Sequence, residues 1–241
     1  MTRALQKSTP QRQFLLSMVL AMAVSLGLYL YGALALGMSF TYLPWNLILA
    51  ALPLAFAVRL VQVLRTKRWS AWEPLGWTLL WLVFLPNSFY MISDFIHLRL
   101  VPADNILYAA VLFTSFIYLG VLLGFCSLIL VHHELRRRLS ARAAGTWIGL
   151  TLLLCSFAIY IGRDLRWNSW DVIFNPAGLL FDVSDRILRP DDYPMMFVTV
   201  LSFFALLGSL YVVVWAGARL LRLVNPNQAA TISQNAKRHV S

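Results

Sequence analysis

The sequence GRDLRWNSWD, residues 162–171, follows directly on a fully apolar segment. It contains four charged residues, one amide and two tryptophans. Tryptophans and charges gather where an apolar helix leaves the hydrocarbon core of a bilayer, so this stretch marks the end of a membrane span. A second polar stretch, residues 86–97, also follows an apolar segment. We interpret the rest of the chain as helices that place these two stretches on one face of a membrane.

The composition indicates a polytopic membrane protein. Of the 241 residues, 60% are hydrophobic and only 12% are charged, whereas charged residues make up about a quarter of an average globular protein. The net charge of +10 would suggest nucleic acid as the partner of a soluble protein. Here the basic residues lie between apolar spans, which favours a topology signal. We therefore expect membrane lipids, and no nucleic acid, as partners.

Six apolar segments predict an all-α fold with six transmembrane helices. They cover about residues 14–36, 43–64, 72–92, 106–130, 146–161 and 195–215. The predicted organisation is a cytoplasmic N-terminus (1–13), a single six-helix transmembrane domain (14–218) and a basic, disordered cytoplasmic tail (219–241). The fifth apolar run is short, so either residues 143–145 extend its helix or Arg163 and Asp164 lie slightly below the interface.

The first segment requires a choice between a span and a cleaved signal peptide. Residues 33–35, Ala-Leu-Ala, resemble a signal-peptidase site. The apolar run before them is longer than the roughly 7–15 residues of a signal-peptide core. We therefore expect this segment to remain as the first span.

The distribution of basic residues predicts the orientation. The N-terminus, the second and fourth loops and the C-terminus together hold 15 Lys and Arg and 2 acidic residues, whereas the other three loops hold 5 and 8. Because cytoplasmic loops carry an excess of Lys and Arg, both termini are expected in the cytoplasm. Both polar stretches are then extracytoplasmic.

The third span contains a proline and polar side chains. Pro86 removes a backbone donor and predicts a kinked or broken helix, with Asn87 and Ser88 facing the bundle interior. An equally acceptable interpretation is a kink whose freed carbonyl is satisfied locally. Asp94 and His97, three residues apart, would share a helix face.

In residues 162–171, helical spacing would place Arg163, Arg166 and the two tryptophans on one face, as an anion clamp with aromatic flanks. Asp164, Asn168 and Asp171 would lie on another face, as acceptors. The alternative is a set of belt tryptophans and solvated loop charges. An arginine at this depth needs a counter-charge, so we predict that Asp94 lies within salt-bridge or one-water reach of Arg163 or Arg166.

Residues 175–190 predict a short extracytoplasmic amphipathic helix. Asn175 and Pro176 form a helix start, and Pro190 ends the pattern. Such a helix would lie in the interface, either as a lid over the polar stretches or as a cover for the bundle.

Two motifs identify a family resemblance. FLPNSFYMISDFIHL (residues 84–98) and IYIGRDLRWNSWD (residues 159–171) resemble an uncharacterised family of bacterial multi-pass membrane proteins, catalogued as a domain of unknown function. The resemblance covers about residues 75–204, although Phe89 stands where the family often has a second proline. It implies a polytopic helical fold in the bacterial inner membrane and no particular activity.

Three function classes follow from these residues. The leading one is an outward-facing polar site that binds or transports an anionic or amphiphilic ligand such as a lipid headgroup, since arginines suit phosphate. The alternatives are a membrane enzyme acting on lipid-linked or envelope substrates and a structural or assembly subunit. An ion pump or channel is disfavoured, because no charge lies deep inside a span. An enzyme is less expected, because GxSxG, HExxH and dense acid–histidine clusters are absent from the sequence.

The site prediction names no catalytic residue, no metal ligand and no cofactor. A lone histidine near acids, as at His97, is a weak metal signal. The candidate ligand-binding residues are Asn87, Ser88, Asp94, His97, Arg163, Arg166, Asn168 and Asp171.

Overall fold

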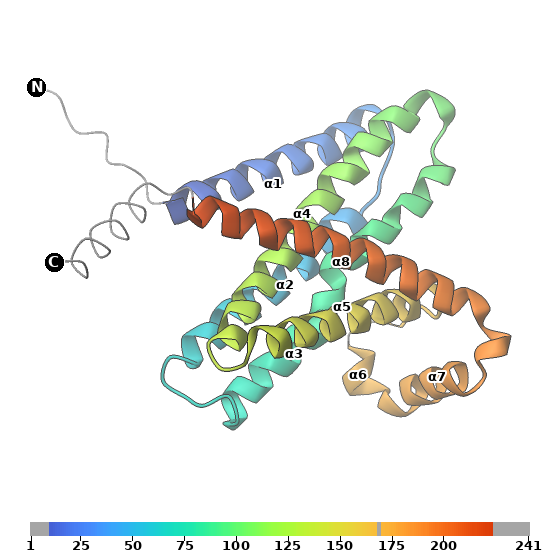
Figure 1. Ribbon diagram of the computed structural model, residues 1–241. Helices are drawn as coiled ribbons and strands as arrows, with labels where there is room; N and C mark the ends of the chain where they lie inside the picture. The colour runs from blue at the N-terminus through green and yellow to red at the C-terminus, as the bar shows by residue number, and fades with distance from the viewer. Residues whose placement is uncertain (1–9, 168–169, 224–241) are drawn as a thin grey trace, which may run out of the picture.

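Six long helices dominate the computed structural model, which describes residues 10–167 and 170–223 (Figure 1). They are α1 (Pro10–Ala35), α2 (Tyr42–Val63), α3 (Trp72–Tyr90), α4 (Ile106–Arg136), α5 (Ala141–Asp164) and α8 (Pro194–Leu223). The short helices are η1 (Met91–Leu100), η2 (Ala103–Asn105), α6 (Asp171–Phe174), α7 (Pro176–Leu188) and η3 (Pro190–Asp192). Among the described residues there are six helices long and apolar enough to cross a membrane, and no strands. The all-α prediction with six such helices is confirmed.

The predicted limits of the transmembrane domain, residues 14 and 218, both fall inside helices of the structure. Helix α1 begins within the predicted N-terminal segment, and α8 continues past residue 218. Residues 1–9 and most of the predicted tail lie outside the described part of the chain. Helix α5 begins before residue 143 and ends with Arg163 and Asp164 in its last turn. The fifth apolar run is thus extended at both ends.

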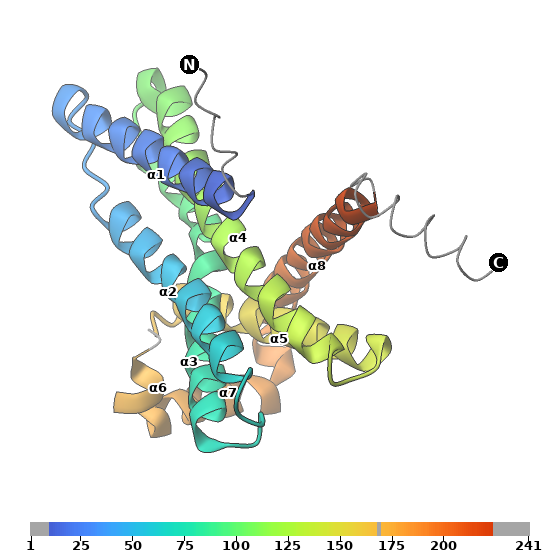
Figure 2. The same cartoon turned by 90° about the vertical axis from the view of Figure 1, so that its left-hand side faces the viewer.

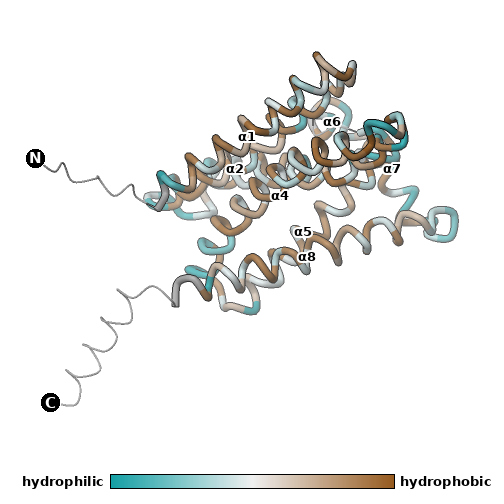
Figure 3. Tube along the Cα trace, turned by 90° about the horizontal axis from the view of Figure 1, so that it is seen from above, coloured by the Kyte–Doolittle hydropathy of each residue, from teal (hydrophilic) through white to brown (hydrophobic). Residues whose placement is uncertain are grey.

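The helices run between two polar ends of the bundle, with apolar residues between them (Figure 3). We call one end the basic end; it carries the connections 64–71 and 137–140. The site end is opposite and carries η1, the end of α5, and helices α6 and α7. Figure 2 shows α8 leaning away from α1, α2 and α4, while it packs on α5 and touches α4.

Helix α4 is the centre of the bundle and contacts α1, α2, α3, α5 and α8. Two glycines one turn apart permit its close approach to α3 and η1. A Cβ atom at Gly120 would lie 2.6 Å from the sulfur of Met91 and 2.8 Å from the carbonyl oxygen of Ser88. One at Gly124 would lie 2.8 Å from the Phe89 ring. Small residues at this spacing are typical of membrane helix interfaces, where backbones pack closely.

Hydrogen bonds from side chains join the same helices. Ser88 is fully buried, and its hydroxyl donates to the carbonyl of Ala50 on α2 over 2.8 Å. Trp81 on α3 donates its indole N–H to the hydroxyl of Ser127 on α4 over 3.2 Å. Such bonds between membrane helices contribute roughly 0.6 kcal/mol each. They fix the positions of α2, α3 and α4 relative to each other.

The third span changes helix type after Tyr90 rather than at its proline. The α-helix continues through Pro86 without a break, so of the predicted kinked or broken helix the kink stays a prediction. The amide of Asn87 donates to the carbonyl of Phe84 over 3.0 Å. From Met91 the chain continues as the ten-residue 3-10 helix η1. Runs longer than three or four residues are uncommon for a 3-10 helix and often mark functional segments.

Helix α7 has the predicted start and end. The side chain of Asn175 accepts a hydrogen bond from the backbone N–H of Gly178 over 3.2 Å, and Pro176 occupies the first turn. The helix ends at Leu188, before Pro190. The helix start at Asn175 and Pro176 and the stop before Pro190 are both marked by neighbouring residues, so this helix could be predicted from the sequence.

The close packing at Gly120 predicts a loss of stability on enlargement. Gly120→Ala should lower the melting temperature in detergent, because the added methyl meets the backbone oxygen of Ser88 and overpacking costs about 1–3 kcal/mol. Gly149→Ala is the matched control, since nothing lies within 4 Å of its added Cβ. Equal melting temperatures for the two variants would contradict the close α3–α4 interface.

Candidate functional site

Arg163 projects from the last turn of α5 toward α3 and η1. Gly162 permits this approach, because a Cβ at that position would lie 3.2 Å from the Tyr90 ring and 3.4 Å from the Trp167 carbonyl oxygen. The guanidinium lies 5.8 Å from the centroid of the Tyr90 ring, within cation–π distance. Helices α5 and α3 therefore meet at the first residues of the 162–171 stretch.

The guanidinium of Arg163 joins the two polar stretches of the sequence. It lies 3.7 Å from the Asp94 carboxylate and donates to the carbonyl of Ser93 over 2.8 Å. It also donates to the hydroxyl of Tyr90 over 3.4 Å. The prediction that Asp94 meets Arg163 or Arg166 is confirmed, with Arg163 as the partner. Several donors of this arginine already have acceptors within the protein.

Asp94 is buried, with 1% of its surface exposed, and has a partner on each carboxylate oxygen. One oxygen faces Arg163, and the other accepts a hydrogen bond from the amide of Asn46 on α2 over 3.1 Å. A buried carboxylate without such partners would be strongly disfavoured. Asp94 thus connects η1 to α5 and to α2.

The 3-10 geometry of η1 places Asp94 and His97 on one row, because side chains three residues apart eclipse in this helix. The Nε2 atom of His97 lies 3.4 Å from a guanidinium nitrogen of Arg163. Since a guanidinium only donates, a hydrogen bond at this contact requires Nε2 as the acceptor, in the imidazole tautomer that carries its proton on Nδ1. The Tyr42 ring packs against His97 at a centroid distance of 4.8 Å.

These side chains line a cavity of about 390 Å³ between α2, α3, η1 and α5. Its polar wall is Tyr42, Asn46, Asn87, Asp94, His97 and Arg163. Further along the same helices the wall is apolar, with Leu49, Val83 and Ala158. Trp45, Tyr90, Trp167 and Trp170 add aromatic surface. The cavity therefore has one polar part and one apolar part, as an amphiphile requires.

The hydroxyl of Tyr42 is buried and has no hydrogen-bond partner among the described residues. Tyr42 lines the cavity beside His97. A buried polar group without a partner costs about 1–3 kcal/mol. A bound molecule that reaches this hydroxyl would supply the missing partner.

Helix α7 covers one side of the cavity. Leu179 contributes to the lining, and the indole N–H of Trp167 donates to the Asp182 carboxylate over 2.8 Å. At the far end of the helix, Tyr193 donates to Asp185 over 2.8 Å, and this bond raises the pKa of the Tyr193 hydroxyl. These contacts hold α7 against the site end.

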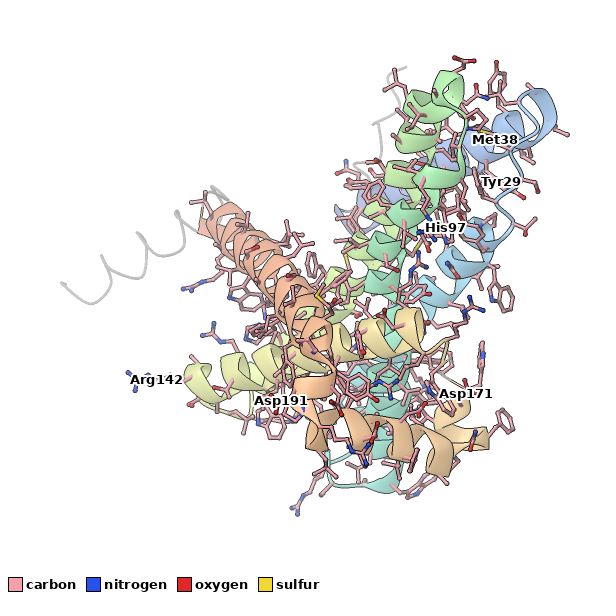
Figure 4. All side chains as sticks on the ribbon, turned by 90° about the vertical axis from the view of Figure 1, so that its right-hand side faces the viewer. Tyr29, Met38, His97, Arg142, Asp171 and Asp191 are labelled. Atoms are coloured by element: carbon pink, nitrogen blue, oxygen red, sulfur yellow. The ribbon has the colours of Figure 1, made fainter. Side chains whose placement is uncertain are left out.

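Four of the eight predicted site residues line the cavity, namely Asn87, Asp94, His97 and Arg163. Ser88 does not, because its hydroxyl is bonded to α2. Asp171 begins α6 and is not part of the lining; it lies away from His97 in Figure 4. Asn168 is outside the described residues.

Arg166 is not in the cavity wall either, so the predicted clamp of two arginines on one helix face is wrong. Helix α5 ends at Asp164, and Arg166 has a positive φ of 58°. This is the left-handed conformation that often follows a helix end and that glycine usually adopts. The sequence has an arginine at this position and so gave no sign of the helix end.

The residues of α2 were missed by the sequence analysis. Tyr42, Trp45, Asn46 and Leu49 all line the cavity. Their spacing of three, four and seven residues is that of one helix face, and Asn46 is an amide within an apolar span. The spacing and the amide together would have indicated that α2 contributes to the cavity wall.

The buried Asp94–Arg163 pair predicts coupled effects on stability. Asp94→Asn leaves the guanidinium without a counter-charge and should lower the melting temperature in detergent, since removing one partner of a buried pair costs about 3–5 kcal/mol. Arg163→Gln should cause little further loss in the Asp94→Asn background. The exposed Arg189–Asp185 pair, at 3.4 Å, is the control and should show weak coupling. Additive losses at Asp94 and Arg163 would contradict the pairing.

Comparison with known proteins gives one family match. A family model described as Protein of unknown function (DUF1361) matches residues 45–208. Comparison with curated proteins and with solved structures gave no significant match. The matched range contains both motifs and every described residue of the cavity wall except Tyr42. The chain belongs to the DUF1361 family.

Proposed function

We propose that the protein binds the polar head of a membrane amphiphile in the cavity between α2, α3, η1 and α5. The observation that carries this proposal is the buried hydroxyl of Tyr42, a residue of the cavity wall, because this hydroxyl lacks a partner among the described residues. The apolar residues further along the same wall suit the first part of a hydrocarbon chain. A cavity of about 390 Å³ is in the range of small-molecule sites.

The charges of the cavity favour a head that is rich in hydroxyl groups over a strongly anionic one. Arg163 and Asp94 lie together and neutralise each other. Arg163 also has Ser93 and Tyr90 as acceptors. An anion would have to displace these partners, whereas a hydroxylated head can use Tyr42 and stack on the aromatic wall.

Binding is favoured over catalysis by the contacts of the two acid–base candidates. The carboxylate oxygens of Asp94 each have a protein partner, and the Nε2 atom of His97 faces Arg163. A general base must lie within hydrogen-bond reach of the substrate proton, whereas Asp94 is buried and Nε2 of His97 faces Arg163 instead. An enzyme acting on lipid-linked substrates remains the second candidate, supported by the shared row of Asp94 and His97.

The proposal includes the orientation indicated by the basic residues. Both termini and the basic end lie in the cytoplasm, and the cavity opens on the extracytoplasmic side of a bacterial inner membrane. The support is the excess of Lys and Arg in the connections of the basic end.

Substitution of Tyr42 should have opposite effects on empty and loaded protein. Tyr42→Phe removes a buried donor without a partner, so the delipidated protein should be as stable as the wild type or more stable. The same change should reduce retention of the co-purifying amphiphile about fivefold, the value of one hydrogen bond of roughly 1 kcal/mol. Native mass spectrometry and melting curves measure the two quantities.

Tyr118→Phe is the control for this experiment, because Tyr118 is exposed on α4 and is not part of the cavity wall. It should change neither quantity. Unchanged retention in Tyr42→Phe, or an equal loss in both variants, would contradict the proposed site.

The orientation is tested by labelling single cysteines in intact cells. Cys126 and Cys155 are replaced first, and cysteine is then introduced at Ser140 or Ser184, which are exposed at the basic end and on α7. An impermeant thiol reagent should label Ser184→Cys and leave Ser140→Cys unlabelled. The reverse pattern would overturn the proposed orientation.

A further inference from the structure

A second cavity lies at the basic end, opposite the candidate site. It is an open depression of the surface with a volume of about 410 Å³, and it is lined by Leu64, Arg65, Arg137 and Arg138. Leu64 caps α2, and Arg137 caps α4. The ends of these two helices therefore place three guanidinium groups around one space.

Arg138 is held in place by contacts with three elements. It forms an ion pair with Glu134 one turn earlier on α4, and it donates to the carbonyl of Leu64 over 3.3 Å. Its guanidinium also lies 5.5 Å from the centroid of the Trp69 ring. Because this arginine is fixed before any ligand arrives, little conformational entropy is lost when a ligand binds it.

The charges around this cavity leave a positive excess. Glu134 is buried, with 6% of its surface exposed, and it also pairs with Arg137 over 3.1 Å. The Glu134 carboxylate thus forms ion pairs with two arginines. Arg65 has no ion pair among the described residues. Three arginines and one carboxylate give a wall with two positive charges in excess.

The position of the cavity along the helix axes indicates where its ligand comes from. The apolar span of α2 ends at Val63, directly before the lining residues. Trp69 packs beside the cavity, and Trp72 at the start of α3 is 83% exposed. Tryptophans of this kind mark the headgroup depth of a bilayer. A phosphate at this depth belongs to a lipid more naturally than to a soluble molecule.

We propose that this cavity binds the phosphodiester headgroup of an anionic phospholipid. Guanidinium groups bind phosphate oxygens through paired hydrogen bonds, and basic pockets between membrane helices recognise anionic lipid heads. Glu134 is the positioning residue, because it pairs with Arg137 and Arg138 and is not part of the lining. This site is independent of the amphiphile cavity at the site end.

The experiment compares two double variants that remove the same charge. Arg65→Gln/Arg137→Gln changes two lining residues. Arg136→Gln/Arg142→Gln changes two exposed residues of the same end that do not line the cavity. Wild type and variants are reconstituted in nanodiscs of phosphatidylcholine with about one fifth phosphatidylglycerol. Native mass spectrometry then counts the phosphatidylglycerol molecules that stay bound.

The lining variant should retain phosphatidylglycerol at least about tenfold less than the wild type, since each basic residue near anionic lipid contributes roughly a fivefold change. The control variant should lose much less. Equal losses would show diffuse attraction by the whole basic end and would overturn the site, as would undiminished retention by the lining variant. Glycerol 1-phosphate, added to detergent-solubilised protein free of phosphatidylglycerol, should not raise the melting temperature. Stabilisation by this soluble probe equal to that by phosphatidylglycerol would overturn the lipid assignment.

Discussion

The ion pair between Asp94 and Arg163 is the interaction on which the site end depends. Asp94 is almost fully buried, and an unpaired carboxylate at such a position would be strongly destabilising. The pair forms where the last turn of α5 meets η1, and Gly162 eases the close approach of α5 to Tyr90 at the end of α3. The amide of Asn46 adds α2 to the same centre. One buried charge thus fixes three helices around the cavity.

The tight packing beside this pair explains why the cavity has a defined shape. Gly120 and Gly124 bring α4 against the segment where α3 becomes η1, and Ser88 is bonded to α2 within the same layer. The 3-10 geometry of η1 aligns Asp94 and His97 toward Arg163. The polar groups of the site are therefore held in place in two ways. The packing of α4 fixes the backbone of α3 and η1, and contacts with Arg163 fix the side chains of Asp94 and His97. The Tyr42 hydroxyl differs from these groups, because Tyr42 lines the same cavity while its buried hydroxyl lacks a partner among the described residues.

Two kinds of feature could be predicted from the sequence: those with a local sequence signal, and those for which the alternative would cost a large amount of free energy. Six spans followed from apolar length, and the start of α7 followed from Asn175 and Pro176. The meeting of Asp94 with an arginine followed from the cost of an isolated charge at membrane depth. The end of α5 was missed because Arg166 occupies a left-handed position without glycine. The 3-10 form of η1 was missed because nothing in residues 91–100 distinguishes bonds over three residues from bonds over four.

A cryo-electron microscopy map of the protein in native lipid nanodiscs tests most directly whether the cavity holds the head of an amphiphile against Tyr42. We expect density for a polar head in the cavity, with an acceptor within hydrogen-bond distance of the Tyr42 hydroxyl and a chain extending along Leu49 and Val83. A cavity filled by protein side chains, or a Tyr42 hydroxyl bonded to another residue with no ligand density beside it, would contradict binding at this site.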